Sequence, residues 1–375
     1  MKRWIYADNA ATTKLDVDAF AAMEPFLIEQ YGNASQPYAF SRLVKKCIVE
    51  AREIIATCIG AEPDEIYFTS GGSESDNWVI KEAAFSDGFK RTTITSQIEH
   101  HAVLNACAAI GRLGYPVAYL PVSDEGVVQP EYLAQHIDNN TRLVSVMLAN
   151  NEIGTIEPVE ELAKIAHAHG ALFHTDAVQA VGHIPVDVKT LGVDMLSASA
   201  HKFNGMKGSG FLYVRKGVEL CSLVDGGAQE YGKRAGTENV AAIVAMAIAL
   251  RKNCKRMEAI TRRLHRLEQV VLKRLSSSGI DYRRNGSSNC LPGNINLSFR
   301  GVAGEMLLHR LDLKGICIST GSACDSVNTR VSHVIEAIRV PSEYAKGTIR
   351  ISFGADNTEE DAEAIANALI SIIQK

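Results

Sequence analysis

The 375-residue sequence lacks several features that would assign it to a class of protein directly. Its eight cysteines include no Cys-x-x-Cys pair, so their spacing fits neither a zinc site nor a disulfide scaffold. The longest uncharged apolar run, Val240 to Leu250, is too short to span a bilayer. The basic residues near the N-terminus are followed by no apolar segment, which argues against a secretory signal. We therefore expect a cytoplasmic protein with no metal and no membrane association.

Neither sign of charge dominates the chain. It has 39 basic and 43 acidic side chains, a net charge of −4, and the two signs are interspersed. This pattern excludes the concentrated basic surface that binds nucleic acid or an anionic membrane. The sequence also lacks internal repeats and low-complexity linkers, and its 46% hydrophobic content is enough for a large core. Small-molecule chemistry is the expected kind of function.

Short β-rich runs alternate with helical segments over residues 64–215. Strands at this spacing predict right-handed crossovers and an α/β fold, in which a mostly parallel seven-stranded sheet has helices on both faces. Ligands of such sheets bind outside the carboxyl ends of the strands. The predicted strands are Ile66 to Thr69, Thr92 to Thr95, Pro116 to Leu120, Leu143 to Leu148, Ala171 to Thr175, Met195 to Ser199 and Gly210 to Val214.

The C-terminal third has a different pattern. Apolar residues recur at helical spacing from Asn239 to about Ser276, which predicts one or two long helices leading into a second unit. Strand-like runs and a closing helix from Thr358 to Ile373 then predict a smaller α+β domain. We expect a large, cofactor-binding domain over residues 13–255 and a small domain made of residues 1–12 and 256–375. The predicted strands of the small domain are Ile295 to Phe299, Ile316 to Ser319 and Thr348 to Ser352.

Lys202 lies where a predicted strand runs into a glycine-rich turn. A lysine at such a junction can carry a carbonyl cofactor as a Schiff base. Asp176 ends an apolar run about one sheet crossover earlier in the chain. A carboxylate there could keep the pyridine nitrogen of pyridoxal phosphate protonated, which makes the ring an electron sink. Together the two residues predict a pyridoxal-phosphate site.

Three further segments follow strand ends and could complete this site. The run Ser70-Gly71-Gly72-Ser73 opens a helical pattern and could cradle a phosphate, or it is a plain strand–turn–helix with Ser73 as the N-cap. His100 could stack on the pyridine ring and shuttle protons, although His101 could be that residue instead. The amide of Asn150 or Asn151 could bind the cofactor's phenolic oxygen or a substrate carboxylate, or the segment is an asparagine-rich turn.

Two residues of the C-terminal third carry chemistry of their own. Cys324 lies in a small, polar segment with the composition of a mobile loop, where a thiol would be exposed. It is otherwise one of eight ordinary cysteines. The guanidinium of Arg350 would match a carboxylate with two hydrogen bonds, or it forms a structural ion pair.

These motifs resemble those of the cysteine desulfurases of the NifS/IscS type, which are fold-type I, class V aminotransferase-like pyridoxal-phosphate enzymes. The resemblance covers essentially the whole chain, in the same order and spacing. Its segments are Tyr6 to Thr13, Thr69 to Asn77, Asn150 to Gly154, Ser199 to Lys202, Arg234 to Asn239, Gly321 to Cys324 and Ile349 to Ser352.

The resemblance implies a role for each matching residue. Lys202 would be the Schiff-base lysine, with Asp176 at the pyridine nitrogen and His100 stacked on the ring. The cofactor would also contact Gln179 at its phenolic oxygen, Asn151 nearby, and a phosphate site made of Gly72, Ser73, Ser199 and His201. Thr237 would reach the phosphate of a neighbouring subunit, which implies a homodimer. The substrate carboxylate would be held by Asn33, Asn151 and Arg350.

The implied reaction converts L-cysteine to L-alanine. Lys202 would remove the Cα proton, and Cys324 would take the sulfur as a persulfide for an acceptor such as an iron–sulfur scaffold protein. Two other readings stay open from the sequence. The first is an aminotransferase or selenocysteine lyase on the same fold without persulfide chemistry, and the second is a sulfur-delivery scaffold that acts mainly by protein binding.

Overall fold

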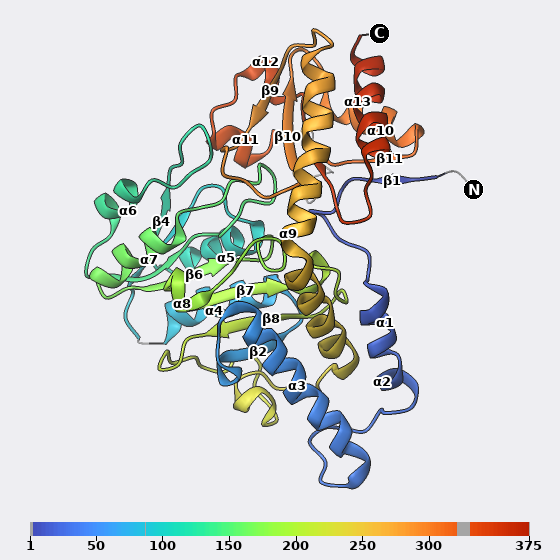
Figure 1. Ribbon diagram of the computed structural model, residues 1–375. Helices are drawn as coiled ribbons and strands as arrows, with labels where there is room; N and C mark the ends of the chain where they lie inside the picture. The colour runs from blue at the N-terminus through green and yellow to red at the C-terminus, as the bar shows by residue number, and fades with distance from the viewer. Residues whose placement is uncertain (1–2, 87, 321–330, 375) are drawn as a thin grey trace.

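The computed structural model describes residues 3–86, 88–320 and 331–374, and its centre is a seven-stranded sheet (Figure 1). The strand order is β2-β8-β7-β6-β5-β3-β4. Neighbouring strands run parallel except β8, which is antiparallel to both β2 and β7. The predicted mostly parallel seven-stranded sheet is therefore confirmed. Its strands are β2 (Ile66–Thr69), β3 (Thr92–Ser96), β4 (Val117–Leu120), β5 (Thr141–Ser145), β6 (Leu172–Asp176), β7 (Met195–Ser199) and β8 (Gly210–Val214).

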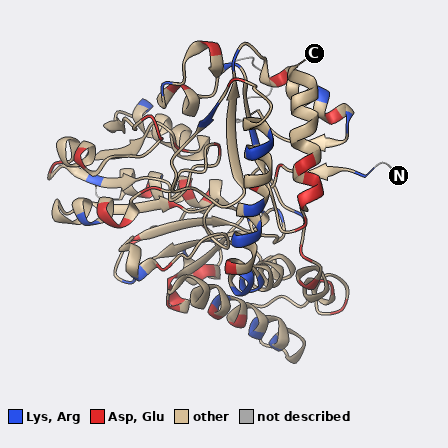
Figure 2. Ribbon diagram, turned by 45° about the horizontal axis from the view of Figure 1, so that its top comes forward, with Lys and Arg blue, Asp and Glu red and all other residues tan. Residues whose placement is uncertain are grey.

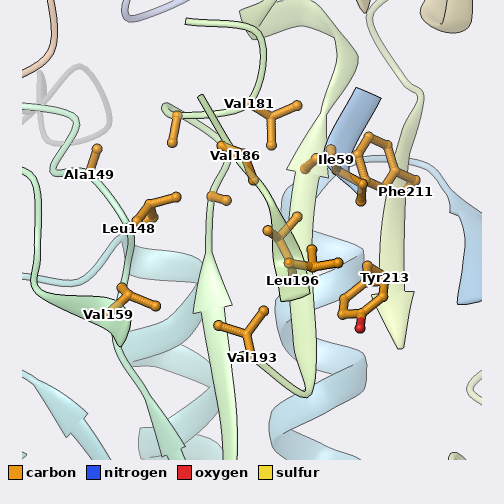
Figure 3. Packing of buried hydrophobic residues seen from close by; sticks show 14 of the residues in the cluster. Ile59, Leu148, Ala149, Val159, Val181, Val186, Val193, Leu196, Phe211 and Tyr213 are labelled. Atoms are coloured by element: carbon orange, nitrogen blue, oxygen red, sulfur yellow. The ribbon is translucent and has the colours of Figure 1, made fainter. Parts of the chain in front are cut away.

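Alternating side chains of this sheet enter two different cores. Met195 of β7 packs in the cluster formed with α4 (Gly72–Phe85) and α5 (His101–Arg112). Its neighbour Leu196 enters the opposite cluster, together with Phe211 and residues of α3 (Arg42–Ile59), as Figure 3 shows for Leu196, Phe211 and Ile59. Both faces of the sheet are buried, which explains why these strands are apolar without strict alternation. The remaining helices of this part are α1 (Val17–Met23), α2 (Pro25–Ile28), α6 (Pro130–His136), α7 (Val159–Ala168) and α8 (Val188–Leu191).

The helical pattern from Asn239 onward forms one continuous helix, α9 (Val240–Ser276). Its N-cap is Asn239, whose side chain accepts a hydrogen bond from the backbone N–H of Ala242. Buried residues up to Leu250 belong to the core of the large sheet, and those from Leu264 belong to a separate C-terminal core. Basic side chains recur along this helix (Figure 2). None of the helices that the structure describes is long and apolar enough to cross a membrane.

The C-terminal unit contains a second sheet, with strand order β12-β10-β9, and a short parallel pair, β1 and β11. Strand β9 was not predicted, because its sequence Tyr-Arg-Arg-Asn has no apolar alternation. The domain boundary at residues 255 and 256 stays a prediction. The elements are β1 (Ile5–Tyr6), β9 (Tyr282–Asn285), β10 (Asn294–Phe299), β11 (Ile316–Cys317) and β12 (Thr348–Ser352), with α10 (Gly304–Leu313), α11 (His333–Ala337), α12 (Ser342–Ala345) and α13 (Glu359–Ile373).

Candidate active site

A cavity of about 310 Å³ contains most of the residues predicted to be functional. Several of them follow or end the strands β5, β6 and β7 at their carboxyl ends, where ligands of parallel sheets bind. Every predicted site residue except Asn33, Thr237 and Cys324 lines it. The predicted lining residues are Gly72, Ser73, His100, Asn151, Asp176, Gln179, Ser199, His201, Lys202 and Arg350.

Lys202 ends a single 3₁₀ turn, Ala200–Lys202, directly after β7. Its Nζ donates hydrogen bonds to the backbone carbonyls of Ala10, at 2.6 Å, and Ala11, at 2.9 Å. The backbone carbonyl of Lys202 lies 2.9 Å from Nε2 of His183. Gln179 donates from its amide to the same Ala10 carbonyl at 2.9 Å. The N-terminal segment therefore forms one wall of the cavity and holds the lysine amine in place.

Asp176 and His100 face each other across the cavity. Asp176 ends β6, is 4% exposed, and accepts a hydrogen bond from the backbone N–H of Val178 at 2.9 Å. Burial raises the pKa of Asp176, and the nearby His100 and Lys202 oppose that rise. A ring nitrogen of His100 and carboxyl oxygens of Asp176 and Asp76 all lie within 4.8 Å of one another. Asp76, on α4, was not predicted from the sequence.

His100 is held as a neutral imidazole. It caps α5, and its Nδ1 accepts a hydrogen bond from the backbone N–H of Ala102 at 3.1 Å. Burial lowers the pKa of His100, which favours the neutral ring, and because Nδ1 accepts a hydrogen bond the proton of that ring is on Nε2. His101 also lines the cavity, but its ring packs edge-on against His333, with centroids 4.9 Å apart. The closeness of its ring nitrogen to Asp176 therefore favours His100 over His101 as the residue expected to stack on a cofactor ring.

The start of α4 forms an anion cradle. Its N-cap is Gly71, with φ of 149° and no side-chain cap, so the alternative in which Ser73 caps the helix is wrong. The first N–H groups of a helix have no partner within it and lie at the positive end of its dipole. A second cavity, of about 400 Å³, opens at this point and includes Thr12 and Lys207, which the sequence analysis missed. It shares four predicted residues with the first cavity: Gly72, Ser73, Ser199 and His201.

These features fit pyridoxal phosphate. The chain supplies an amine for the aldehyde, a buried carboxyl for the ring nitrogen, an imidazole for the ring face and a helix N-terminus for the phosphate. His201 at the cradle is neutral, because burial, with help from Lys202 and Lys207, lowers its pKa to about 4. A neutral imidazole can donate to a phosphate without adding charge.

Arg350 on β12 is only 2% exposed. Its Nη1 donates to the backbone carbonyl of Asn151 and its Nη2 to Oδ1 of Asp8, each at 2.7 Å. The structural ion pair that the sequence left open is thus present. Among the described residues, however, Nε of Arg350 is buried and has no hydrogen-bond partner. Because Arg350 also lines the cavity, it can still donate to a substrate carboxylate.

Three predicted residues are not placed in the cavity. The side-chain oxygen of Asn33 accepts a hydrogen bond from the backbone N–H of Ser35 at 2.9 Å, and Asn33 does not line the cavity in this chain. Thr237 is exposed and also lies outside it. Cys324 and its neighbour Asp325 lie outside the described residues. The roles of all three predicted residues stay predictions.

A lysine after one central strand, an acid at the end of the neighbouring strand and a helix N-terminus beside them are the groups expected of an α/β enzyme that anchors a cofactor through a lysine. The chain belongs to the class V aminotransferase family, whose model matches residues 5–365. It is 50% identical to the cysteine desulfurase IscS of Dictyoglomus turgidum, over 100% of this chain and 96% of that protein.

Solved structures give the same result. A NifS-like protein superposes with a TM-score of 0.94 and 37% identity, covering 99% of this chain and 100% of the other. A structure described as SspA in complex with cysteine has a TM-score of 0.84 and 34% identity, covering 93% and 98%. The resemblance to cysteine desulfurases predicted from the sequence is confirmed.

Proposed function

We propose that the chain is a pyridoxal-phosphate-dependent cysteine desulfurase that converts L-cysteine to L-alanine and transfers the sulfur to Cys324. The observation that carries this proposal is the arrangement of Lys202, Asp176 and His100 around one cavity that also contains Arg350. The similarity to cysteine desulfurases over the full chain supports the same reaction.

When bound, pyridoxal phosphate supplies a protonated ring that stabilises negative charge at the substrate Cα. Asp176 would keep the ring nitrogen protonated, and the N-terminus of α4 would hold the phosphate. Lys202 must leave the carbonyls of Ala10 and Ala11 to act as an uncharged base, and both carbonyls lie in the cavity wall. His100, whose lowered pKa favours the neutral imidazole, could take or return a proton beside the ring.

The substrate is oriented by its carboxylate. Arg350 and Asn151 line the cavity and would bind this group, because hydrogen bonds fix the Arg350 guanidinium and leave its Nε without a partner among the described residues. The amine of Lys202 then takes the Cα proton. The thiolate of Cys324 attacks the substrate sulfur, so an S–S bond forms as the C–S bond breaks. The electron pair stays with the carbon skeleton, which takes up protons and leaves as alanine.

Alanine and sulfide formation from cysteine, measured for the wild type and Cys324→Ala, tests this reaction. We expect Cys324→Ala to lose sulfur transfer and Cys221→Ala, which changes an exposed cysteine, to keep it. Full turnover by Cys324→Ala would instead support a lyase without persulfide chemistry, and selenocysteine is the substrate to try next. Sulfide release from cysteine by a pyridoxal-phosphate-loaded wild type would exclude the scaffold reading.

We also propose that the enzyme is a homodimer in which Thr237 completes the phosphate site of the partner. Thr237 is exposed and does not line its own chain's cavity. Large apolar side chains are exposed on and just after the first two helices, α1 and α2. They include Val17, Phe20, Ile28 and Tyr31. Such side chains are typical of a surface that another protein covers.

Co-expression of Lys202→Ala with Thr237→Ala chains tests the shared site. Each mixed dimer would contain one site with both native residues, so we expect about a quarter of wild-type activity from random pairing at limiting cofactor. If Thr237 acted within its own chain, mixing would restore nothing. An iron–sulfur scaffold as sulfur acceptor and a cytoplasmic location stay proposals, and persulfide transfer to a co-purified acceptor would test the first.

A further inference from the structure

A buried acid in the wall of the site has no role in the chemistry described above. Asp76 is on α4, is 1% exposed and lines the cavity. One of its carboxyl oxygens lies within 4.8 Å of a carboxyl oxygen of Asp176. Among the described residues, Oδ1 of Asp76 has no hydrogen-bond partner. Two carboxylates at this separation, both out of water, cannot easily carry two charges.

The groups around Asp76 supply no positive charge to hold a second anion. On β6, His174 has a ring nitrogen 3.7 Å from Oδ1 of Asp76, and burial lowers the pKa of His174 to about 3, so it is neutral. Ser197 on β7 hydrogen-bonds the Asp76 carboxyl. Glu99, before α5, brings no positive charge either, because burial raises the pKa of its carboxyl to about 8. His100 is neutral, and Lys202 acts on Asp176.

A hydrogen-bonded chain connects these groups through the sheet. The hydroxyl of Ser145 lies 2.9 Å from Nδ1 of His174, and Nε2 of His174 lies 2.9 Å from the hydroxyl of Ser197. All of its members are buried, and all of them can be satisfied without any charge. The chain therefore offers Asp76 neutral partners only, while Asp176 faces His100 and Lys202.

We propose that Asp76 is an uncharged carboxylic acid that positions Asp176, so that the two side chains together carry a single negative charge. The O–H of Asp76 supports the Asp176 carboxylate from behind, and the one charge remains available for the ring nitrogen of the cofactor. Asp76 is a positioning residue, since it acts through Asp176. This inference rests on the proposed role of Asp176.

The protonation state of Asp76 can be measured without cofactor, by ¹³C NMR of the full chain labelled at the aspartate carboxyl carbons. We expect the signal that Asp76→Asn removes to have the shift of a protonated carboxyl from about pH 6 to about pH 8. Asp194 is the matched control, because it is equally buried but pairs with Arg215 at 2.5 Å. The signal that Asp194→Asn removes should be that of a carboxylate. A carboxylate shift for Asp76 would overturn the proposal.

Titration with pyridoxal phosphate, followed by its absorbance, tests the positioning role. Asp76→Asn keeps a donor behind Asp176 and should bind as the wild type does, whereas Asp76→Leu should bind about tenfold more weakly. Wild-type affinity in a folded Asp76→Leu variant would overturn the positioning role. A wild-type chain that takes up no cofactor, yet shows the protonated Asp76 signal, would overturn the proposed function and support the charge-sharing pair.

Discussion

Replacing Arg350 by lysine should separate substrate recognition from structural support. Arg350→Lys keeps the positive charge beside Asp8 but removes the planar fork, whose Nε has no partner among the described residues and could donate to a substrate carboxylate. A hydrogen bond to a charged group contributes about 1.5–3 kcal/mol. With about 1.36 kcal/mol for each factor of ten, kcat/KM for cysteine should fall about 10- to 150-fold.

The assay is alanine formation against cysteine concentration, together with inhibition by cysteamine, which is cysteine without its carboxylate. We expect Arg350→Lys to raise the KM for cysteine and to leave the inhibition constant of cysteamine nearly unchanged. Arg339→Lys is the control, since Arg339 forms an exposed pair with Asp124 at 2.6 Å and should behave as wild type. An unchanged kcat/KM in Arg350→Lys would show that Arg350 serves only the ion pair with Asp8.

Two further predictions concern stability. Gly210→Ala would place Cβ 2.5 Å from the Ala198 carbonyl oxygen and 2.6 Å from Cα of Gly71. We therefore expect a denaturant titration to show a loss of about 1–3 kcal/mol in unfolding free energy, together with weaker cofactor binding. The control Gly111→Ala, whose nearest contact would be at 4.0 Å, should not destabilise the protein in the same titration. Burial raises the pKa of Glu99 from 4.5 to about 8, against hydrogen bonds from Ser96 and Met147, so the fold favours the protonated acid. The stability that the Glu99 carboxyl contributes to the fold is therefore complete below pH 4.5 and is lost as the pH rises through about 8. The Tm of the wild type should fall over that range, and Glu99→Gln should flatten this fall. An equally steep fall in Glu99→Gln would contradict this assignment.

The sequence predicted the parts of the molecule that follow from local pattern. Apolar runs between turns located all seven strands of the central sheet, and the continuous helical spacing after Asn239 predicted α9. Strand β9 was missed because Tyr282 to Asn285 is polar, and its pairing depends on β10, which is a tertiary contact. A pattern within one segment contains no information about such a partner.

The same limit applies to the site. Lys202 and Asp176 were predicted because Asp176 ends an apolar run and Lys202 lies where a strand runs into a glycine-rich turn, and strand ends meet at one edge of a parallel sheet. The carbonyls of Ala10 and Ala11 and the ion pair of Asp8 could not be predicted, because Ala10 and Ala11 lie 192 and 191 residues from Lys202 and Asp8 lies 342 residues from Arg350. Asp76 is the residue that pattern could have suggested, since an acid on a buried face of a helix is unusual.

The central claim is that Lys202 carries the cofactor. Incubation with pyridoxal phosphate, reduction with borohydride and peptide mass spectrometry would locate the bond directly. We expect one modified peptide, which contains Lys202, with the modification lost in Lys202→Arg and kept in Lys207→Arg. Modification of a different lysine, or of none, would contradict it.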